Sequence, residues 1–485
     1  MIGIVSYGSY LPVNRIKRET IFKAMGWLHQ ATFMKGEKCV ANFDEDSITM
    51  AVASGMNCLE GRDREDIEQL YFATTTSPFS ERCGAGIIGT ALDVSSKIST
   101  FDLTGSIRAG TSALISALNS ISSGETHSAL ICASDMRLGK PGSSQELGFS
   151  DGAASLLIGD KDVIAESEGS YSVSYDFPGA WRTENDKTDR AWEDRFGREE
   201  GYKKFIIESI SGLMDKYKQN PGNINKIVFP GIYPRDHSSI CKALGFGPEQ
   251  IHDHLMNDMG NTGTAYPLML LISALEEAKP GQRLIVAGYG NGCDALMFQV
   301  TDNIESIQRK KGGLKKSLKS HRELQSYEKY LAFRGLISPE GGIRAEAIPY
   351  TAMSLTWRDR REILGLCGTR CKECGTPQYP AQKVCVNPGC QAVDKMEPYR
   401  FSEKKGKIFS FTADLLSYTP NPPAIYAVID FEGGGRFWFD ITDCDIDSLK
   451  IGTEVEMTFR RRYVDERGGI IGYFWKAVPV WGYNE

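Results

Sequence analysis

The chain has 485 residues, of which 41% are hydrophobic and 24% charged, a composition typical of globular proteins with more than one hydrophobic core. A formal net charge of -6 argues against general nucleic-acid binding, which needs a basic surface to displace phosphate counterions. The N-terminus lacks a basic segment followed by an apolar one, and no stretch approaches the roughly 18 apolar residues of a membrane span. We therefore expect a cytoplasmic protein with no nucleic-acid or membrane partner.

Residues 1 to about 300 alternate short apolar runs with longer helical stretches. This alternation is typical of layered α/β architecture, in which helices cover the faces of a sheet. The runs that predict strands lie at 69–74, 129–134, 153–159, 226–229 and 283–288.

The composition changes between residues 303 and 362. Residues 309–316 form a basic run, and residues 324–336 have the pattern of an amphipathic helix. Because charge runs usually face water, we favour a linker with surface helices over a binding patch.

Five of the twelve cysteines crowd into the next segment. Cys371 and Cys374 form one close pair, and Cys385 and Cys390 form a second. Four thiolates in two pairs favour tetrahedral zinc, and such a site leaves no open position for a substrate. The spacing therefore predicts a structural zinc ion, with Cys367 as a possible substitute ligand.

Beyond residue 395 the chain is rich in short β-type runs, which predict a small barrel of OB type. The aromatic residues Phe437, Trp438 and Phe439 are expected in the core and rim of this barrel, rather than as platforms for nucleobases. The predicted strands lie at 408–412, 424–430, 436–440 and 454–459.

The region from about 345 to 485 resembles the rubredoxin-like zinc ribbon and OB-fold that accompany thiolases and hydroxymethylglutaryl-CoA synthases in archaea and bacteria. The matching text is Arg370-Cys371-Lys372-Glu373-Cys374-Gly375, Gln378-Tyr379-Pro380 and residues 406–412. The resemblance implies a module that helps to hold coenzyme A and bridges catalytic subunits.

Several stretches of residues 1–300 resemble hydroxymethylglutaryl-CoA synthase, especially its archaeal form, and run in the family's order. They are residues 44–52, 101–111, 260–264, 276–281 and 288–292. The resemblance implies a thiolase-like five-layer αβαβα body, followed by the zinc ribbon and the OB-type β-barrel. We expect two thiolase-like halves at 1–165 and 166–302 and a linker with helices at 303–362. The zinc ribbon is expected at 363–395 and the OB-fold at 396–485.

The resemblance also places three catalytic positions, and none holds the family's residue. Ile107 stands where the family has its nucleophilic cysteine, in the text Ile107-Arg108-Ala109-Gly110-Thr111. Thr75 occupies the position of the acid/base glutamate, and Pro230 that of the histidine. Since isoleucine cannot carry an acyl group, ordinary thioester exchange is not expected.

Other side chains could supply the chemistry. Tyr233 and Tyr266 could donate a proton through a phenol, and His237 lies seven residues after Pro230. Ser106 adjoins Ile107 but would need an adjacent base to become a nucleophile. Cys83 is expected to be an ordinary buried thiol.

Two residues of the thioester-binding frame match the family. Asn261 corresponds to the residue that orients the acyl carbonyl, and Gly290 lies in a loop whose backbone N–H faces the developing oxyanion. Such preorganised donors stabilise a transition state without a covalent step. Alternatively, Gly290 and the other glycines of these matching stretches could simply form tight turns.

Three functions follow from these residues. The first is an enzyme that makes or breaks a carbon–carbon bond on an acyl-CoA by aldol or retro-aldol chemistry, which needs no acyl-enzyme. The resemblance supplies a precedent in thiolase-fold aldolases of steroid side-chain breakdown, which work with a partner carrying the zinc-ribbon and OB module. The second is a non-catalytic subunit that pairs with an active thiolase or synthase and contributes coenzyme A binding or bridging. Whichever function holds, we expect a homodimer or a hetero-oligomer with a thiolase-type chain. The third, an intact acyltransferase that uses Ser106, is the least favoured.

Overall fold

A computed structural model describes residues 1–28, 34–308, 313–342, 350–465 and 467–480. The chain divides into two compact units, and each is described by itself. The first unit comprises Met1–Ala41, Met50–Gly86 and Ser95–Tyr330. The second unit comprises Asn42–Thr49, Ile87–Val94 and Leu331–Glu485.

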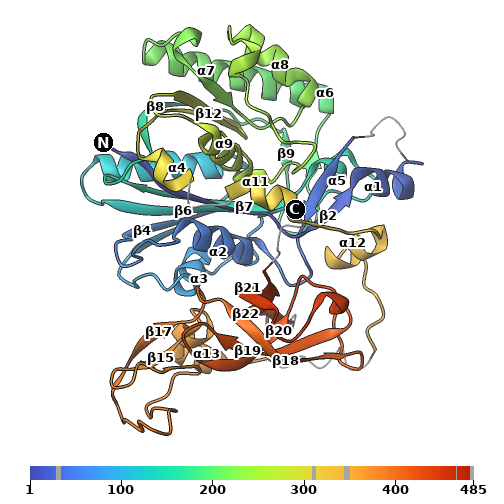
Figure 1. The fold of residues 1–485 in the computed structure, drawn as a ribbon. Coiled ribbons are helices and arrows are strands. Elements are labelled where there is room, and N and C mark those ends of the chain that lie inside the picture. Colours follow the sequence, from blue (N-terminus) through green and yellow to red (C-terminus); the bar gives the residue numbers. More distant parts are fainter. Residues whose placement is uncertain (29–33, 309–312, 343–349, 466, 481–485) are drawn as a thin grey trace. The chain divides into compact units, whose positions relative to one another are not determined.

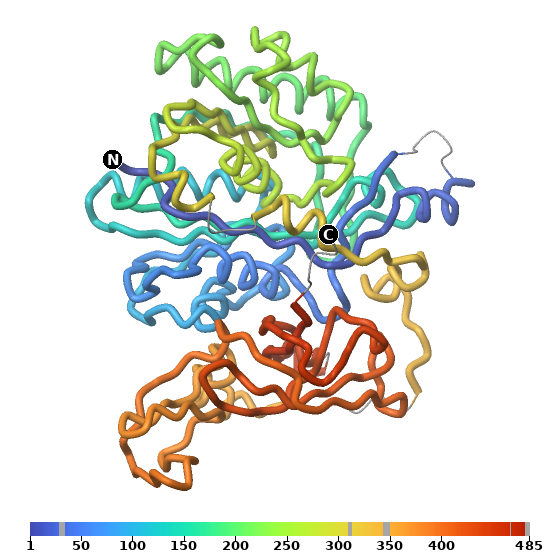
Figure 2. The backbone as a smooth tube through the Cα atoms, viewed as in Figure 1, coloured from blue at the N-terminus to red at the C-terminus, as the bar shows by residue number. Residues whose placement is uncertain are grey.

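A nine-stranded mixed sheet organises the first unit, in the order β11-β12-β13-β8-β1-β7-β6-β4-β5. The central strand β1 pairs with β7 along its length but with β8 only at Gly3 and Ile4. It therefore joins two sets of strands, β11-β12-β13-β8 on one side and β7-β6-β4-β5 on the other. Figure 2 shows this N-terminal segment, in dark blue, running through the middle of the unit. The strands are β1 (Gly3–Tyr10), β4 (Gln69–Ala73), β5 (Ser99–Leu103), β6 (Ser128–Met136), β7 (Asp151–Gly159), β8 (Ala165–Ser174), β11 (Lys226–Val228), β12 (Arg283–Tyr289) and β13 (Gly292–Val300).

Helices separate and cover the two sets of strands (Figure 1). The helices α4 (Ala109–Ser122) and α9 (Tyr266–Glu277) share one core with apolar residues of both sets, so they form the middle layer. The helices α7 (Lys203–Lys216) and α8 (Pro234–Ala243) pack on the opposite face of β11, β12 and β13. Helix α2 (Ser47–Cys58) lies against β1 and β7, where Ser54 hydrogen-bonds to Ser155 at 2.7 Å. These contacts give five alternating layers.

Shorter elements complete the first unit. A three-stranded sheet has the order β14-β2-β3, and a two-stranded sheet consists of β9 and β10. Their bounds are β2 (Asn14–Lys17), β3 (Glu37–Val40), β14 (Arg322–Glu323), β9 (Ala180–Trp181) and β10 (Arg190–Ala191). The remaining helices are α1 (Arg18–Met25), α5 (Ser144–Gly148), α6 (Asp194–Phe196), α10 (Ile304–Gln308) and α11 (Gly313–Lys319), with a π-helical turn at Gly197–Tyr202. The helices α3 (Gly84–Ala91) and α12 (Tyr327–Phe333) each have residues in both units.

The second unit contains a closed five-stranded barrel, in the order β18-β19-β20-β22-β21, and a three-stranded sheet β16-β15-β17 that carries the clustered cysteines. Within the barrel Phe439 is buried, whereas Trp438 is 51% exposed, as expected for core and rim positions. The elements are α13 (Met353–Arg358), α14 (Arg360–Ile363), β15 (Cys367–Cys371), β16 (Pro377–Gln378), β17 (Met396–Arg400), β18 (Gly406–Asp414), β19 (Ala424–Phe431), β20 (Arg436–Ile441), β21 (Glu454–Asp465) and β22 (Ile470–Pro479).

The predicted fold class is confirmed: an α/β body of thiolase type precedes a small metal-ribbon sheet and a β-barrel. The predicted strands coincide with β4, β6, β7, β11, β12 and β18 to β21, and the helix expected at 324–336 is the shorter α12. Residues 309–312 of the basic run lie outside the described residues. None of the described helices is long and apolar enough to cross a membrane.

The sequence did not indicate that residues 42–49 and 87–94 belong to the second unit. Residues 87–94 contribute Asp93, which pairs with Arg361 at 2.7 Å and Arg400 at 2.8 Å. Residues 42–49 take part in a buried ionic cluster around Arg460, whose side chain is 2% exposed. Its guanidinium contacts Asp44 at 3.2 Å and Glu45 at 3.0 Å and also pairs with Asp443, while Lys476 lies 2.9 Å from Asp44. Burial alone would raise the pKa of Asp44, but the Lys476 and Arg460 charges outweigh burial and lower the pKa to about 2.

Replacement of Arg460 tests how much this cluster contributes to the free energy of unfolding of the second unit. Arg460→Met leaves three carboxylates around one buried site without their guanidinium, so we expect it to destabilise the second unit by about 3–5 kcal/mol. Urea denaturation followed by circular dichroism measures the change. Arg436→Met, which breaks an exposed ion pair with Asp430, is the matched control and should leave the curve almost unchanged. Equal effects of the two substitutions would contradict the prediction that the buried cluster stabilises the second unit.

Candidate functional site

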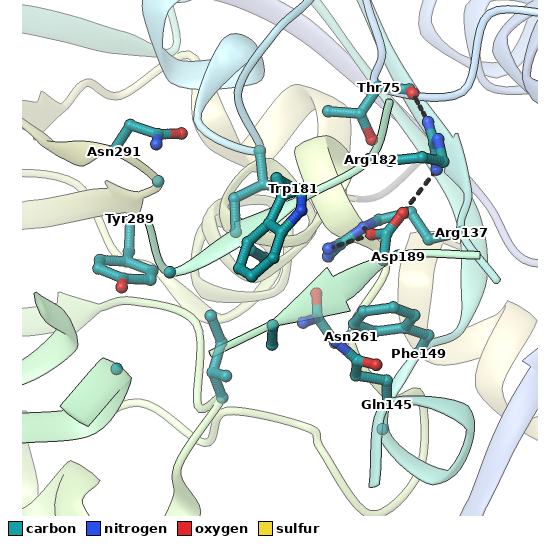
Figure 3. A pocket seen from close by; sticks show the side chains of 18 of the residues that line it. Thr75, Arg137, Gln145, Phe149, Trp181, Arg182, Asp189, Asn261, Tyr289 and Asn291 are labelled. Atoms are coloured by element: carbon teal, nitrogen blue, oxygen red, sulfur yellow. Dashed lines mark hydrogen bonds and ion pairs between the residues drawn. The ribbon is translucent and has the colours of Figure 1, made fainter. Parts of the chain in front are cut away.

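A cavity of about 590 Å³ opens in the first unit, next to the ends of several strands of the large sheet and of several helices. Figure 3 shows the indole of Trp181 in the cavity, between Tyr289 on one side and a polar wall that includes Asp189 on the other. The lining includes the sequence-predicted positions Thr75, Ile107, Tyr233, Asn261 and Gly290.

A buried carboxylate, Asp135 at the end of β6, fixes the loop that carries Thr75. Its Oδ1 accepts hydrogen bonds from the Thr75 backbone N–H at 2.7 Å and the Thr75 hydroxyl at 3.0 Å. The Thr74 and Thr76 hydroxyls also donate to Oδ1, and the Thr264 N–H donates to Oδ2 at 2.8 Å. Because Asp135 is fully buried and Thr75 is committed to it, Thr75 positions the loop rather than offering a base to the cavity.

Asn261 presents a donor to the cavity. Its Oδ1 accepts from the Gly263 N–H at 3.0 Å, which orients the carboxamide. Gly263 has φ +63°, and a Cβ there would lie 2.3 Å from Asp135 Oδ2, so glycine is required at this turn. The Asn261 Nδ2 donates to no atom of the described residues, and it is available to a carbonyl or enolate oxygen in the cavity.

Gly290 differs from its expected role. Its N–H donates to the Gly292 carbonyl at 2.9 Å, so this N–H does not face the cavity as a free oxyanion donor. Glycine is needed here because the backbone at Gly290 passes close to the turn at Ile107. A Cβ would lie 2.7 Å from Ile107 Cγ1 and 2.8 Å from Ser106 Oγ. Ser106 Oγ donates to the Gly290 carbonyl at 2.8 Å, and no base contacts it among the described residues.

An ion pair immobilises the turn at Ile107, just before α4. Arg108 lies 3.2 Å from the buried Asp294, and its guanidinium also donates to the Val173 carbonyl at 2.8 Å. Asp294 accepts further hydrogen bonds from Thr111 at 3.0 Å and Ser112 at 2.8 Å, at the start of the helix. The Ile107 side chain is thus held as a fixed apolar surface of the cavity.

Tyr233 lines the cavity at the N-terminus of α8, three residues after Pro230. The carboxylate of Asp194, which also lines the cavity, acts on this phenol electrostatically. Burial and the Asp194 carboxylate raise the pKa of the Tyr233 phenol, so the phenol is protonated at neutral pH. Tyrosine and carboxylate together form a pair that can hold and transfer a proton.

Two of the predicted residues lie behind the cavity wall. His237 stacks on Phe229 with ring centroids 4.0 Å apart, and burial, followed by the nearby His254, lowers its pKa to about 4. Tyr266 is fully buried and donates to the His254 carbonyl at 2.6 Å. Neither residue is among the described residues that line the cavity, and both have structural partners.

A polar lock at the cavity wall, formed by Arg137, Arg182 and Asp189, has no signal in the sequence. Arg137 and Arg182 both pair with the buried Asp189, and Arg182 also donates to the Thr75 carbonyl (Figure 3). The Arg182 contact with Asp189 is 2.6 Å, and the Arg137 guanidinium lies 4.0 Å from the centroid of Phe149. These contacts fix the ends of β9 and β10, and they come from residues far apart in the chain.

Nucleophilic side chains are scarce at this site. Among the described residues that line the cavity there is no cysteine and no histidine. The expectation that Cys83 is buried is wrong, because its thiol is exposed, where Sγ lies 3.7 Å from Asp102. Cys83 is not a lining residue.

The second unit gathers Cys371, Cys374, Cys385 and Cys390 at one point. All four sulfur atoms lie within 4.8 Å of one another, with 3.8 Å between Cys371 and Cys390 and 3.5 Å between Cys374 and Cys385. A tetrahedron with Zn–S bonds of about 2.3 Å has edges of about 3.8 Å, so the donor set and its size fit structural zinc. Cys367 lies outside this cluster.

Substitution of a cluster cysteine tests the metal site. We expect about one zinc ion per chain, and Cys374→Ser should lower the zinc content to near zero after dialysis against a chelator, because the site loses a thiolate. Elemental analysis by mass spectrometry measures the ratio. Cys83→Ser is the control and should retain zinc, and an equal zinc content in both variants would contradict the assignment.

The C-terminal region matches two family models. Residues 362–397 match the ChsH2 rubredoxin-like zinc ribbon domain. Residues 399–460 match the ChsH2 C-terminal OB-fold domain. The ribbon and the barrel therefore have the domain types expected from the sequence.

The remainder of the chain is similar to hydroxymethylglutaryl-CoA synthases. The enzyme of Methanopyrus kandleri is 33% identical over 322 residues, which cover 64% of this chain and 90% of the relative. That of Methanocaldococcus jannaschii is 32% identical over 319 residues, 64% of this chain and 92% of the relative. A crystal structure of HMG-CoA synthase complexed with CoA has a TM-score of 0.62 at 16% identity, covering 71% of this chain and 92% of the other, and it shares the fold.

Proposed function

Because this chain belongs to the hydroxymethylglutaryl-CoA synthase family, we propose that its cavity binds a coenzyme A thioester and that the protein makes or breaks a carbon–carbon bond of the acyl group by aldol chemistry. The observation that carries the proposal is the lining of the cavity. Ile107 lines the cavity just before α4 and cannot form an acyl-enzyme, whereas the Tyr233 phenol, the Asp194 carboxylate and the Asn261 amide donor line the same cavity.

The retro-aldol direction assigns a task to each group. The 3-hydroxyl of a 3-hydroxyacyl-CoA gives its proton to the Tyr233 oxygen as the phenol proton moves to Asp194, and the C3 oxygen becomes a carbonyl. The C2–C3 bond breaks, and its electron pair forms the thioester enolate, whose oxygen Asn261 Nδ2 stabilises. C2 then takes a proton from water, and the hydroxide that forms takes the proton held by Asp194, which restores the carboxylate.

The fixed loops around the cavity support this chemistry energetically. Asp135 and Asp294 hold the Thr75 and Ile107 turns through hydrogen bonds of 2.7–3.2 Å, so little reorganisation is needed when charge develops. None of these steps needs an acyl-enzyme.

Substitution of Tyr233 tests the proton transfer. We expect Tyr233→Phe to lower the rate of aldehyde or ketone release from 3-hydroxyacyl-CoA thioesters by about 10²- to 10⁴-fold, because the phenol that moves the proton is gone. The product is measured as its hydrazone. Tyr175→Phe is the matched control, since the Tyr175 phenol also has a neighbouring carboxylate, Glu208, to which it donates at 2.8 Å, but it lies outside the cavity lining. Full activity of Tyr233→Phe would refute the role.

Acylation provides a separate test. After incubation with acetyl-CoA, the intact mass of the protein should be unchanged, because Ile107 cannot form a thioester and Ser106 donates its proton to a backbone carbonyl. Intact-protein mass spectrometry measures this. A stable acyl adduct would instead support an acyltransferase that uses a hydroxyl or a displaced thiol.

A second function is favoured by the same absence of cysteine and histidine among the described lining residues. In it, the chain is a non-catalytic subunit that binds acyl-CoA and assembles with a thiolase-type chain. The purified chain alone then releases no carbonyl product, and activity requires the partner. The two functions are thus separated by assaying the chain with and without the proteins that copurify with it.

A further inference from the structure

Five of the aromatic rings that line the cavity form what we call the aromatic wall, whereas a sixth, Phe149, lies against Arg137. The five are Phe177, Trp181, Trp192, Tyr233 and Tyr289. Trp181 is 39% exposed and Trp192 63% exposed, although both are large apolar side chains. Exposed indoles at a concave site mark a surface that contacts a ligand rather than a core.

Buried rings hold the wall in place from behind. Tyr202, which is fully buried, packs edge-to-face against Tyr233 at 5.2 Å and against Tyr289 at 5.4 Å, and Phe205 packs against Phe177 at 5.3 Å. The Tyr202 hydroxyl donates to the Pro230 carbonyl at 2.7 Å, which fixes the ring.

A glycine lets two wall residues approach the backbone of the π-helical turn. A Cβ at Gly201 would lie 2.5 Å from Phe177 Cε1 and 2.8 Å from the Tyr289 hydroxyl. The wall is therefore a tightly packed surface of fixed shape. A ring that binds to it meets a preorganised platform and loses little protein entropy.

The tryptophans stand on the two-stranded sheet that Asp189 secures. Trp181 pairs with Arg190 in the β9–β10 register, and Trp192 follows β10 directly. Arg182 follows Trp181 and is bound to Asp189 at 2.6 Å, so the backbone on both sides of the indoles is anchored. Figure 3 shows the Trp181 indole in the middle of the cavity, between Tyr289 and the Asp189 lock.

From this wall we infer that the acyl group accepted by the cavity carries an aromatic ring, an inference that rests on the proposed binding of a CoA thioester. The ring lies against the indole of Trp181 and the wall of Phe177 and Tyr289, with the thioester carbonyl toward Asn261. Offset and edge-to-face contacts favour an aromatic ring over a saturated ring of similar size by about two- to tenfold for each ring pair.

Calorimetric titration of the full chain tests the inference with two thioesters that cannot undergo aldol cleavage. Benzoyl-CoA and cyclohexanecarboxyl-CoA have six-membered rings of similar size, and only the first is aromatic. We expect benzoyl-CoA to bind at least about fivefold more tightly than cyclohexanecarboxyl-CoA. Its advantage over acetyl-CoA, which has no ring, should be larger still. Trp181→Leu keeps apolar bulk but should lower the preference for the aromatic ring by about two- to tenfold, because one of the contacting rings is lost.

Trp357→Leu is the control, because Trp357 is 69% exposed and does not line the cavity. It should keep the preference, and circular dichroism checks that both variants are folded. Equal binding of the two ring compounds by the wild type, or an unchanged preference in Trp181→Leu, would overturn the aromatic inference while leaving acyl-CoA binding intact. Failure of every CoA ester to bind would instead refute the proposed function together with it.

Discussion

The carboxylate of Asp135 is the point on which the geometry of the site depends. It receives hydrogen bonds from the loop after β4 and from the turn before α9, which are far apart in the sequence. A buried carboxylate without a cationic partner is stable only when donors surround it, so both loops must keep their positions. The loop at Thr75 and the turn that orients Asn261 are consequently parts of one polar network.

A second constraint is the division of the cavity into two chemically different walls. The polar wall carries a charged cluster in which one carboxylate, Asp189, pairs with both Arg137 and Arg182. The aromatic wall consists mainly of rings that pack against one another, with the Asp194 carboxylate near Tyr233. A ligand with a polar carbonyl and an apolar end therefore has only one orientation that satisfies both walls.

The sequence predicted the layered body, the four-cysteine site and the barrel, because each has a local signal in apolar periodicity or in cysteine spacing. The positions of Thr75, Ile107 and Asn261 followed from motif order, and all three line one cavity. The sequence could not predict that Tyr266 and His237 lie behind the wall, or that the Gly290 N–H is taken by Gly292, since these depend on tertiary contacts. The Arg137–Asp189–Arg182 lock was missed because no spacing rule links residues about fifty positions apart.

The ionic cluster at Arg460 has a consequence for how this architecture can be divided. Two of its acidic members, Asp44 and Glu45, come from the beginning of the chain, whereas the barrel strands come from its end. A fragment starting at Leu331 would expose Arg460 and Lys476 without these counter-charges. The ribbon and barrel are therefore not an appendage that one cut can release intact, and any recombination that transplants them must carry the short N-terminal segment as well.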